Sequence, residues 1–313
     1  EDVAGPVRPD TAVAPPPRAP VRLTGELVLP AEPLVADRRF PLGLRLRNDG
    51  DGEARLRPER PGRAPTGVLR LLREDEPLGE LALTDDGWET AFGNAPMTLA
   101  PGAAVTFELV RLRAPTVFGE VELRVEYDVV DERGGALPLT LPPARAQVAW
   151  TGLTVLHLGD SLVAGGLTQR LAQRVREAGG RYVTDCWVSS NAPRWLGSER
   201  LTQRLRDNLP EIVLVTLGTN EYEVGTREEY LGYYDRLASR LGAHRRCFWI
   251  GPPGLPGVDR FVEAARRRTA PCPFFDSSGI APDSGRDRDH LSRARGEEWA
   301  DEIWAWLGKQ WRP

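Results

Sequence analysis

The sequence has 313 residues, of which 41% are hydrophobic and 27% are charged, and its net charge is -4. This length exceeds the roughly 100 to 200 residues of a single domain, so we expect two domains, each with its own core. No apolar run approaches the roughly 18 residues of a membrane-spanning helix. We also find no basic patch with interleaved aromatic residues, which argues against a nucleic-acid partner.

Residues 1–20 are rich in proline and alanine and show no periodicity. This composition predicts an extended linker rather than a folded element. The first residue is Glu1 and the only methionine is Met97, so we expect that a leader has been removed. The sequence therefore favours an extracytoplasmic protein that is periplasmic, on the cell surface or secreted.

Between residues 21 and 150, apolar and polar residues alternate in short runs that Gly, Pro and Asp interrupt. Such alternation predicts half-buried strands, and seven or eight of them suggest an all-β, immunoglobulin-like sandwich as an accessory domain over residues 21–150. The predicted strands cover residues 21–29, 40–48, 67–74, 78–84, 104–112, 119–130 and 137–141. The segment from Asn48 to Glu53 is too short for an EF-hand loop, and we interpret it as a hairpin turn.

From residue 151 onward, apolar strands alternate with helical stretches, which predicts a second domain over residues 151–313. The predicted strands cover residues 153–158, 182–188, 211–217, 246–250 and 272–276, and the helices lie near residues 162–178, 198–208, 226–241, 258–268 and 294–309. The expected fold is α/β, a three-layer, doubly wound, five-stranded parallel sheet of flavodoxin-like type. Ligands of such folds bind beyond the carboxyl ends of the strands.

The first of these strands runs into Gly159, Asp160 and Ser161, and a helix follows. This places Ser161 at a strand-to-helix turn, where backbone N–H groups and the helix dipole can stabilise an anion. Ser161 is therefore a candidate nucleophile. Taken alone, the pattern fits a helix-capping serine better.

Two other segments place polar side chains near the same sheet edge. Asn220 follows the strand over residues 211–217, and its amide could donate a hydrogen bond to an oxyanion. Asp287 and His290 precede the last helix at a spacing that lets a carboxylate orient an imidazole. Each signal alone also fits a turn or a solvated loop, but their order along the chain suggests one shared site.

Together, the segments VLHLGDSL, Leu217 to Asn220 and Asp287 to His290 resemble the motifs of the GDSL or SGNH hydrolase superfamily. The resemblance covers residues 151–313. It implies a nucleophilic Ser161, a general base His290 and an orienting Asp287. It also implies an oxyanion hole formed by the Ser161 N–H and the Asn220 amide.

In this superfamily, the backbone N–H of a glycine after the second strand is also an oxyanion donor. Here Ser190 aligns with that glycine, and we expect its N–H to take the same role. Arg194 and Trp195 follow closely and could bind an anionic or sugar-like substrate by charge and stacking, or could simply pack the loop. His157 and His244 are interpreted as structural or solvated residues.

The resemblance predicts a serine esterase that deacylates a carbohydrate or another envelope ester through an acyl-serine intermediate, with acetyl as the expected acyl group. An O-acyltransferase acting on an envelope or extracellular polysaccharide would use the same residues. A catalytically inactive glycan-binding protein is a third alternative. No Cys or His cluster has metal-ligand spacing and no glycine-rich loop fits a nucleotide, so we expect no metal or cofactor.

The chain has three cysteines, Cys186, Cys247 and Cys272. In an oxidising compartment, this odd number permits one disulfide and one free thiol. Cys247 and Cys272 each begin one of the last two predicted strands, which should be neighbours in the sheet, so we expect them to be bonded. Cys186 should then be a buried, small apolar residue.

Overall fold

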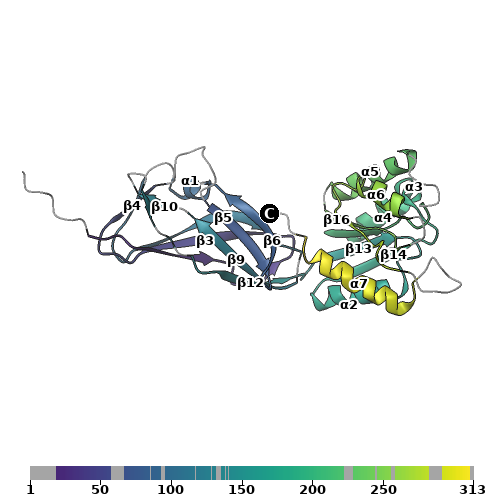
Figure 1. Cartoon of the computed structure of the whole chain (residues 1–313), viewed down its shortest axis with the longest axis horizontal. Helices are drawn as coiled ribbons and strands as arrows, with labels where there is room; N and C mark the ends of the chain where they lie inside the picture. The colour runs from purple at the N-terminus through teal and green to yellow at the C-terminus, as the bar shows by residue number, and fades with distance from the viewer. Residues whose placement is uncertain are drawn as a thin grey trace, which may run out of the picture.

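The computed structural model describes residues 19–57, 67–84, 86–92, 96–116, 118–127, 129–131, 135–137, 139, 141–221, 228–243, 245–254, 258–281 and 291–310. Within these residues, an all-β region precedes an α/β region (Figure 1). No described helix is long and apolar enough to cross a membrane. The change from strands alone to alternating strands and helices follows the change in hydrophobic period in the sequence.

The strands of the all-β region form three sheets. The first has the order β1 (Leu23–Val28), β3 (Arg39–Asn48), β8 (Ala104–Arg113). The second has the order β2 (Leu34–Val35), β12 (Ala144–Ala149), β9 (Gly119–Tyr127), β5 (Gly67–Arg73), β6 (Glu76–Leu83). The third consists of short strands in the order β11 (Ala136–Leu137), β10 (Val129–Asp131), β4 (Ala54–Arg57), β7 (Met97–Leu99). The short helix α1 (Asp86–Phe92) packs near β8.

The alternating pattern in the sequence marks the inner faces of these sheets. Leu42, Leu44 and Leu46 of β3 are fully buried and alternate with more exposed residues. They belong to the same core as Leu123 of β9, which lies in a different sheet. The immunoglobulin-like assignment of this region, and the division of the chain at residues 20 and 150, stay predictions.

The predicted hairpin between Asn48 and Glu53 is wrong. β3 pairs with β1 and β8, whereas β4 pairs with β10 and β7, so this segment passes from one sheet to another. The reason lies in Asn48, which is fully buried and donates hydrogen bonds to the carbonyl oxygens of Gly52 (2.7 Å) and Leu99 (3.0 Å). These bonds hold the crossing segment against β7.

In the α/β region, five parallel strands confirm the predicted sheet. Their order is β14 (Arg181–Cys186), β13 (Thr154–Gly159), β15 (Ile212–Thr216), β16 (Arg246–Ile250), β17 (Phe274–Phe275). The helices are α2 (Gly165–Glu177), α3 (Ala192–Leu196), α4 (Glu199–Asn208), α5 (Glu228–Gly242), α6 (Asp259–Arg266) and α7 (Arg293–Leu307). This order, with the first strand inside the sheet, is that of a doubly wound fold.

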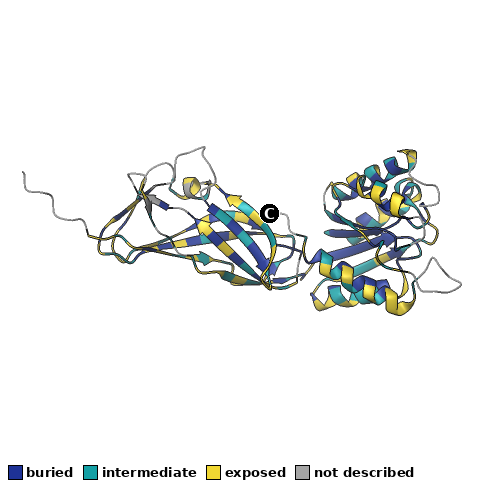
Figure 2. Cartoon of the chain, in the orientation of Figure 1, coloured by how far each residue is buried: buried dark blue, intermediate teal, exposed yellow. Residues whose placement is uncertain are grey.

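Helices cover both faces of this sheet, with α2 and α7 on one side and α3 to α6 on the other (Figure 1). Alternate residues along a strand explain the two layers. Val155 of β13 packs in the core shared with α2 and α7, whereas its neighbour Leu156 packs in the core shared with α4 and α5. Figure 2 shows the strands between these helices as mostly buried.

Hydrogen bonds connect the two regions around the C-terminal end of α7. Thr116 Oγ1 lies 2.8 Å from the carbonyl oxygen of Gln310 and 3.2 Å from that of Leu307. Nearby, Arg246 and Asp37 form a largely buried ion pair at 3.1 Å. The all-β region thus contacts the amino end of the parallel sheet, opposite to the carboxyl end.

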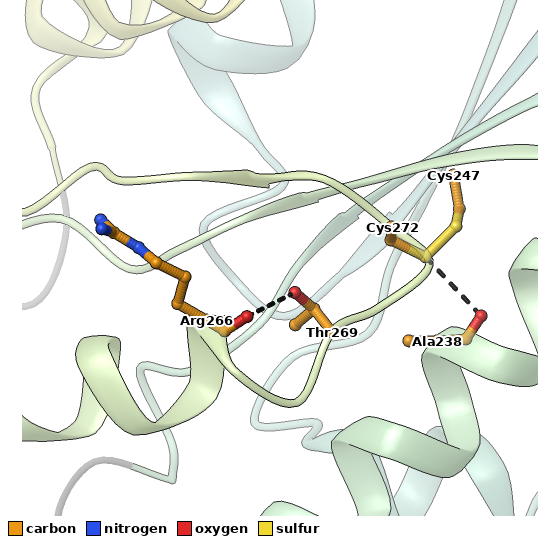
Figure 3. The surroundings of a disulfide bond; sticks show 5 residues. All are labelled: Ala238, Cys247, Arg266, Thr269 and Cys272. Carbon is orange, nitrogen blue, oxygen red and sulfur yellow. Dashed lines mark hydrogen bonds between the residues drawn. A yellow bond between two sulfur atoms is a disulfide. The ribbon is translucent and has the colours of Figure 1, made fainter. Parts of the chain in front are cut away.

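A disulfide joins Cys247 of β16 to Cys272, just before β17 (Figure 3). This confirms the predicted pair and the neighbouring positions of the two strands. Cys186 is the free cysteine, but it is only partly buried, so the prediction of a buried apolar residue is wrong. Its position at the end of the edge strand β14 leaves one side of the thiol uncovered.

Candidate active site

Ser161 follows the carboxyl end of β13, the second strand of the sheet, and is half-buried. Asp160 organises its turn, because the N–H of Leu162 donates to Asp160 Oδ1 (2.9 Å) and the N–H of Val163 donates to the Asp160 carbonyl oxygen (3.1 Å). A glycine is required at position 159, since a Cβ there would lie 2.3 Å from the carbonyl oxygen of Thr216. The tight turn therefore depends on Gly159 and Asp160.

Helix α2 begins at Gly165, later than the sequence predicts. Ser161 accordingly lies in the turn before the helix and not at its first turn. Because the effect of a helix dipole decreases within about one turn, most of the support for charge at Ser161 must come from individual donors.

Asn220 lies at the same sheet edge, after β15, and is exposed to solvent. Its Nδ2 donates to the carbonyl oxygen of Ser190 (2.9 Å) and makes a longer contact of 3.3 Å with Asp160 Oδ2. The first bond fixes the plane of the amide. The second is at the long limit for an N–H···O bond, so one hydrogen of the amide remains weakly engaged next to the Ser161 turn.

The prediction that the Ser190 N–H is an oxyanion donor does not hold in this structure. That N–H donates to the carbonyl oxygen of Trp187 (2.9 Å) and closes a turn, in which Ser189 has a φ of 55°. The Ser190 hydroxyl is buried as well: it donates to the carbonyl oxygen of Gly159 (3.3 Å) and accepts from the indole of Trp195 (2.9 Å). Ser190 therefore braces the Ser161 turn.

A cavity of about 120 Å³ lies beside Ser161. Its lining comes from the Ser161 turn and the first turns of α2 and α7, namely Ser161, Leu162, Ala164, Gly165, Gly166, Leu167, Leu291, Ser292, Gly296 and Trp299. Leu291 and Ser292 directly follow His290 in the sequence. Asp287 and His290 themselves lie outside the described residues, as does His244.

The two proposed substrate contacts after β14 differ from each other. Trp195 is only 1% exposed and packs edge to face against Trp187, so its predicted stacking on a substrate is wrong. Arg194 is exposed, with its guanidinium 4.6 Å from the ring centre of Trp187 and 2.9 Å from the carbonyl oxygen of Ser189. The half-buried Trp187 and Arg194 thus form the aromatic and cationic surface beside the site.

Asp185 stabilises this surface through Arg200, which contacts Trp187. Its buried carboxylate accepts hydrogen bonds from Arg200 and, at 2.6 Å, from Arg204 Nε. Burial alone would raise the pKa of Asp185, but the bonds from Arg200 and Arg204 lower it below its ordinary value. Arg200 also lies 5.1 Å from the ring centre of Trp187, so the ion pair holds Trp187 in place.

His157 is fully buried in β13 and is structural, as the sequence analysis expects. Its ring nitrogens bond to Tyr182 Oη (2.6 Å) and Thr216 Oγ1 (2.7 Å) on the two neighbouring strands. Burial lowers the pKa of His157 to about 3, so the ring is neutral. It therefore cross-links the sheet beneath the site and does not take part in proton transfer there.

Glu221 is a buried carboxyl group at this edge that the sequence does not predict. The N–H of Ala192 donates to Glu221 Oε1 (2.8 Å), and desolvation, reinforced by the negative charge of Asp160, raises the pKa of Glu221 to about 8. The only signal in the sequence is an acidic residue directly after Asn220, which is ordinarily a solvated turn residue.

No family model matches the chain, and no curated protein matches its sequence. Among solved structures, it is similar to a carbohydrate acetylesterase family member from Sinorhizobium meliloti, with 16% identity, a TM-score of 0.41, and coverage of 50% of this chain and 100% of that chain. It is also similar to TesA (21% identity, TM-score 0.42, 49% and 97%). A third is Axe2, an acetylxylan esterase from Geobacillus stearothermophilus (15% identity, TM-score 0.42, 52% and 97%).

Proposed function

We propose that this protein is a serine esterase of the SGNH type, which removes acyl groups through an acyl-serine intermediate. The observation that carries this proposal is the shared cavity. Ser161 lines it together with Leu291 and Ser292, the residues that directly follow the predicted base His290. The starts of α2 and α7 therefore both lie beside Ser161. Asn220 contacts Asp160, the residue before Ser161.

In the proposed reaction, Ser161 Oγ attacks the ester carbonyl carbon while His290 accepts the hydroxyl proton. The negative charge on the carbonyl oxygen is stabilised by the Ser161 N–H and by the weakly engaged hydrogen of the Asn220 amide. His290 then protonates the leaving alcohol, and a water molecule hydrolyses the acyl-serine bond by the same steps. Asp287 orients the imidazole throughout.

The size of the cavity favours a short acyl group, and we propose acetyl. Pockets for drug-sized ligands have volumes of roughly 300 to 1,000 Å³, whereas this cavity measures about 120 Å³. Its walls are close together, because Gly166 of α2 and Gly296 of α7 pack backbone to backbone. The buried ring of Trp299 closes the interior.

For the alcohol part of the substrate, we propose a carbohydrate. Trp187 follows β14 and Arg194 lies in α3, and the exposed guanidinium over the half-buried indole suits the hydroxyl groups of a sugar. We further propose an extracytoplasmic location. The Cys247–Cys272 disulfide supports it, since disulfides persist mainly in oxidising compartments.

A series of p-nitrophenyl esters tests this proposal. We expect hydrolysis of the acetyl ester and a decrease of about tenfold or more in kcat/KM by the hexanoyl ester, because the longer chain exceeds the cavity. The Ser161→Ala variant should be inactive on every ester. Equal activity on acetyl and hexanoyl esters would contradict the acyl-group assignment, and absence of activity on all of them would contradict the esterase.

An acetylated saccharide and an unacetylated saccharide acceptor, supplied together, distinguish hydrolysis from transfer. We expect free acetate as the product. Acetylated acceptor as the main product would identify an acyltransferase, and tight saccharide binding without either product would identify a glycan-binding protein.

A further inference from the structure

Glu221 is a fully buried carboxyl group that directly follows the exposed Asn220. Its Oε1 accepts the N–H of Ala192 (2.8 Å), and the Tyr234 hydroxyl of α5 and the backbone of Gly218 also act on the carboxyl group. The Tyr234 hydroxyl is itself buried, and burial together with the charge of Glu221 raises the pKa of Tyr234. Burying a carboxyl group near the negative charge of Asp160 is costly, so a role in folding alone does not explain it.

The contact with Ala192 links two loops of the site. Ala192 is the first residue of α3, which directly follows the turn containing Ser190. Glu221 is adjacent in sequence to Asn220, whose amide bonds to the Ser190 carbonyl oxygen. Two hydrogen bonds from neighbouring residues, Asn220 and Glu221, therefore hold the loop after β15 to the loop after β14.

We propose that Glu221 is a positioning residue, which holds the Asn220 amide in place for oxyanion stabilisation by fixing the start of α3. This inference rests on the proposed esterase function. Glu221 does not touch the reacting atoms in the proposed reaction. It acts through the backbone of Ala192 and through the loop that it shares with Asn220.

The electrostatics of the site make this role sensitive to pH. Burial, and then the charge of Asp160, raise the pKa of Glu221 to about 8. The titratable side chains of described residues that act on it are Asp160 after β13 and Tyr234 of α5, and it forms no ion pair with any described Arg or Lys. Ionisation near pH 8 therefore places a second negative charge close to Asp160 and to the developing oxyanion. Activity should decrease as the pH rises through this region.

Two substitutions separate positioning from ionisation. Glu221→Ala removes the bond to Ala192, and we expect kcat to fall about 10- to 100-fold with little change in KM, because small misplacements of catalytic groups carry costs of this size. Glu221→Gln keeps a carbonyl acceptor for Ala192 but cannot ionise. We expect near-normal kcat at pH 7 and no decrease in activity at about pH 8.

Glu211→Ala is the matched control, since Glu211 Oε2 also accepts a backbone N–H, that of Thr154 (2.9 Å), but at the opposite end of β15. A kcat for Glu221→Ala equal to that of Glu211→Ala would overturn the proposal, as would an unchanged alkaline decrease in Glu221→Gln. If Glu221→Ala does not fold, the pH profile of Glu221→Gln decides.

Hydrogen–deuterium exchange provides a readout that does not depend on activity. We expect the peptide covering residues 187–194 to exchange faster in Glu221→Ala than in Glu211→Ala, because the N–H of Ala192 loses its acceptor. If the wild-type protein hydrolyses no ester, the proposed function fails, and exchange still decides whether Glu221 fixes this loop. Equal exchange in the two variants would contradict the structural part of the inference.

Discussion

The side-chain amide of Asn220 donates a 2.9 Å hydrogen bond to the carbonyl oxygen of Ser190. This bond joins the loops that follow β15 and β14, on either side of the Ser161 turn at the end of β13. The orientation of the amide is therefore set before a substrate arrives. Such preorganised donors stabilise a developing oxyanion without reorganisation during the reaction.

Replacing Asn220 by alanine should consequently reduce turnover. We expect a loss of about 100- to 1,000-fold in kcat with a nearly unchanged KM, since the donor is needed most when charge develops. Asn208→Ala is a suitable control, because the Asn208 amide also bonds to a carbonyl oxygen (that of Arg204, 2.9 Å) but at the end of α4. A large increase in KM at normal kcat would instead make Asn220 a substrate-binding residue.

The contact between α2 and α7 should tolerate no added atom. A Cβ at Gly166 would lie 2.0 Å from the carbonyl oxygen of Arg293, so Gly166→Ala must push the helices apart. We expect a loss of about 1 to 3 kcal/mol in the free energy of unfolding, or more. Activity should fall as well, because both helices line the cavity at Ser161.

Gly232→Ala in α5 is the matched control, since nothing lies within 4 Å of its added Cβ. Alanine favours helix over glycine by up to about 1 kcal/mol, so this variant should be as stable as the wild type or more so. Equal stability of the two variants in denaturant unfolding would show that the close helix contact is not required.

His157 should make the fold sensitive to acid. Its pKa is about 3 in the folded protein and about 6.5 in an unfolded chain. Between these values the unfolded chain binds more protons, so the free energy of unfolding decreases as the pH falls, by at most about 1.4 kcal/mol per pH unit. His157→Gln does not titrate and should show a shallower slope below about pH 6.5. Identical slopes for the two proteins would mean that His157 does not carry this effect.

The sequence predicts the parallel sheet well because β13 and β15 are buried on both faces, and such strands appear as unbroken apolar runs. It does not predict α3, since five residues are too few for a helical period. Contacts between residues far apart in the sequence cannot be predicted from local patterns either. Nothing local distinguishes Asn48 as a buried residue between two sheets or Trp195 as a core residue rather than a stacking surface.

The same limit applies to the candidate site. Ser161 and Asn220 could be predicted because each directly follows a strand, and parallel strands end at one edge. The engagement of the Ser190 N–H with Trp187 depends on the backbone of one turn, and the burial of Glu221 depends on α3 and α5 closing over it. Neither is encoded in a local pattern of residue types.

The predicted base and orienter should differ in importance. His290→Ala should reduce kcat nearly as much as Ser161→Ala, and the double variant should be hardly worse than either, because the two residues act as a unit. Asp287→Ala should reduce kcat less, since Asp287 only orients and supports the imidazole. If Asp289→Ala proved more damaging than Asp287→Ala in a kcat comparison, the assignment of the orienter would be wrong.

Ser161 is the predicted nucleophile, and covalent labelling can identify it. A p-nitrophenyl alkylphosphonate transfers its phosphonyl group to an activated serine oxygen with release of p-nitrophenol, and peptide mass spectrometry locates the adduct. We predict one adduct per chain, on the peptide containing Ser161, with loss of esterase activity in proportion to labelling. Ser161→Ala should remain unlabelled. An adduct on another serine, or an active and labelled Ser161→Ala variant, would contradict the account.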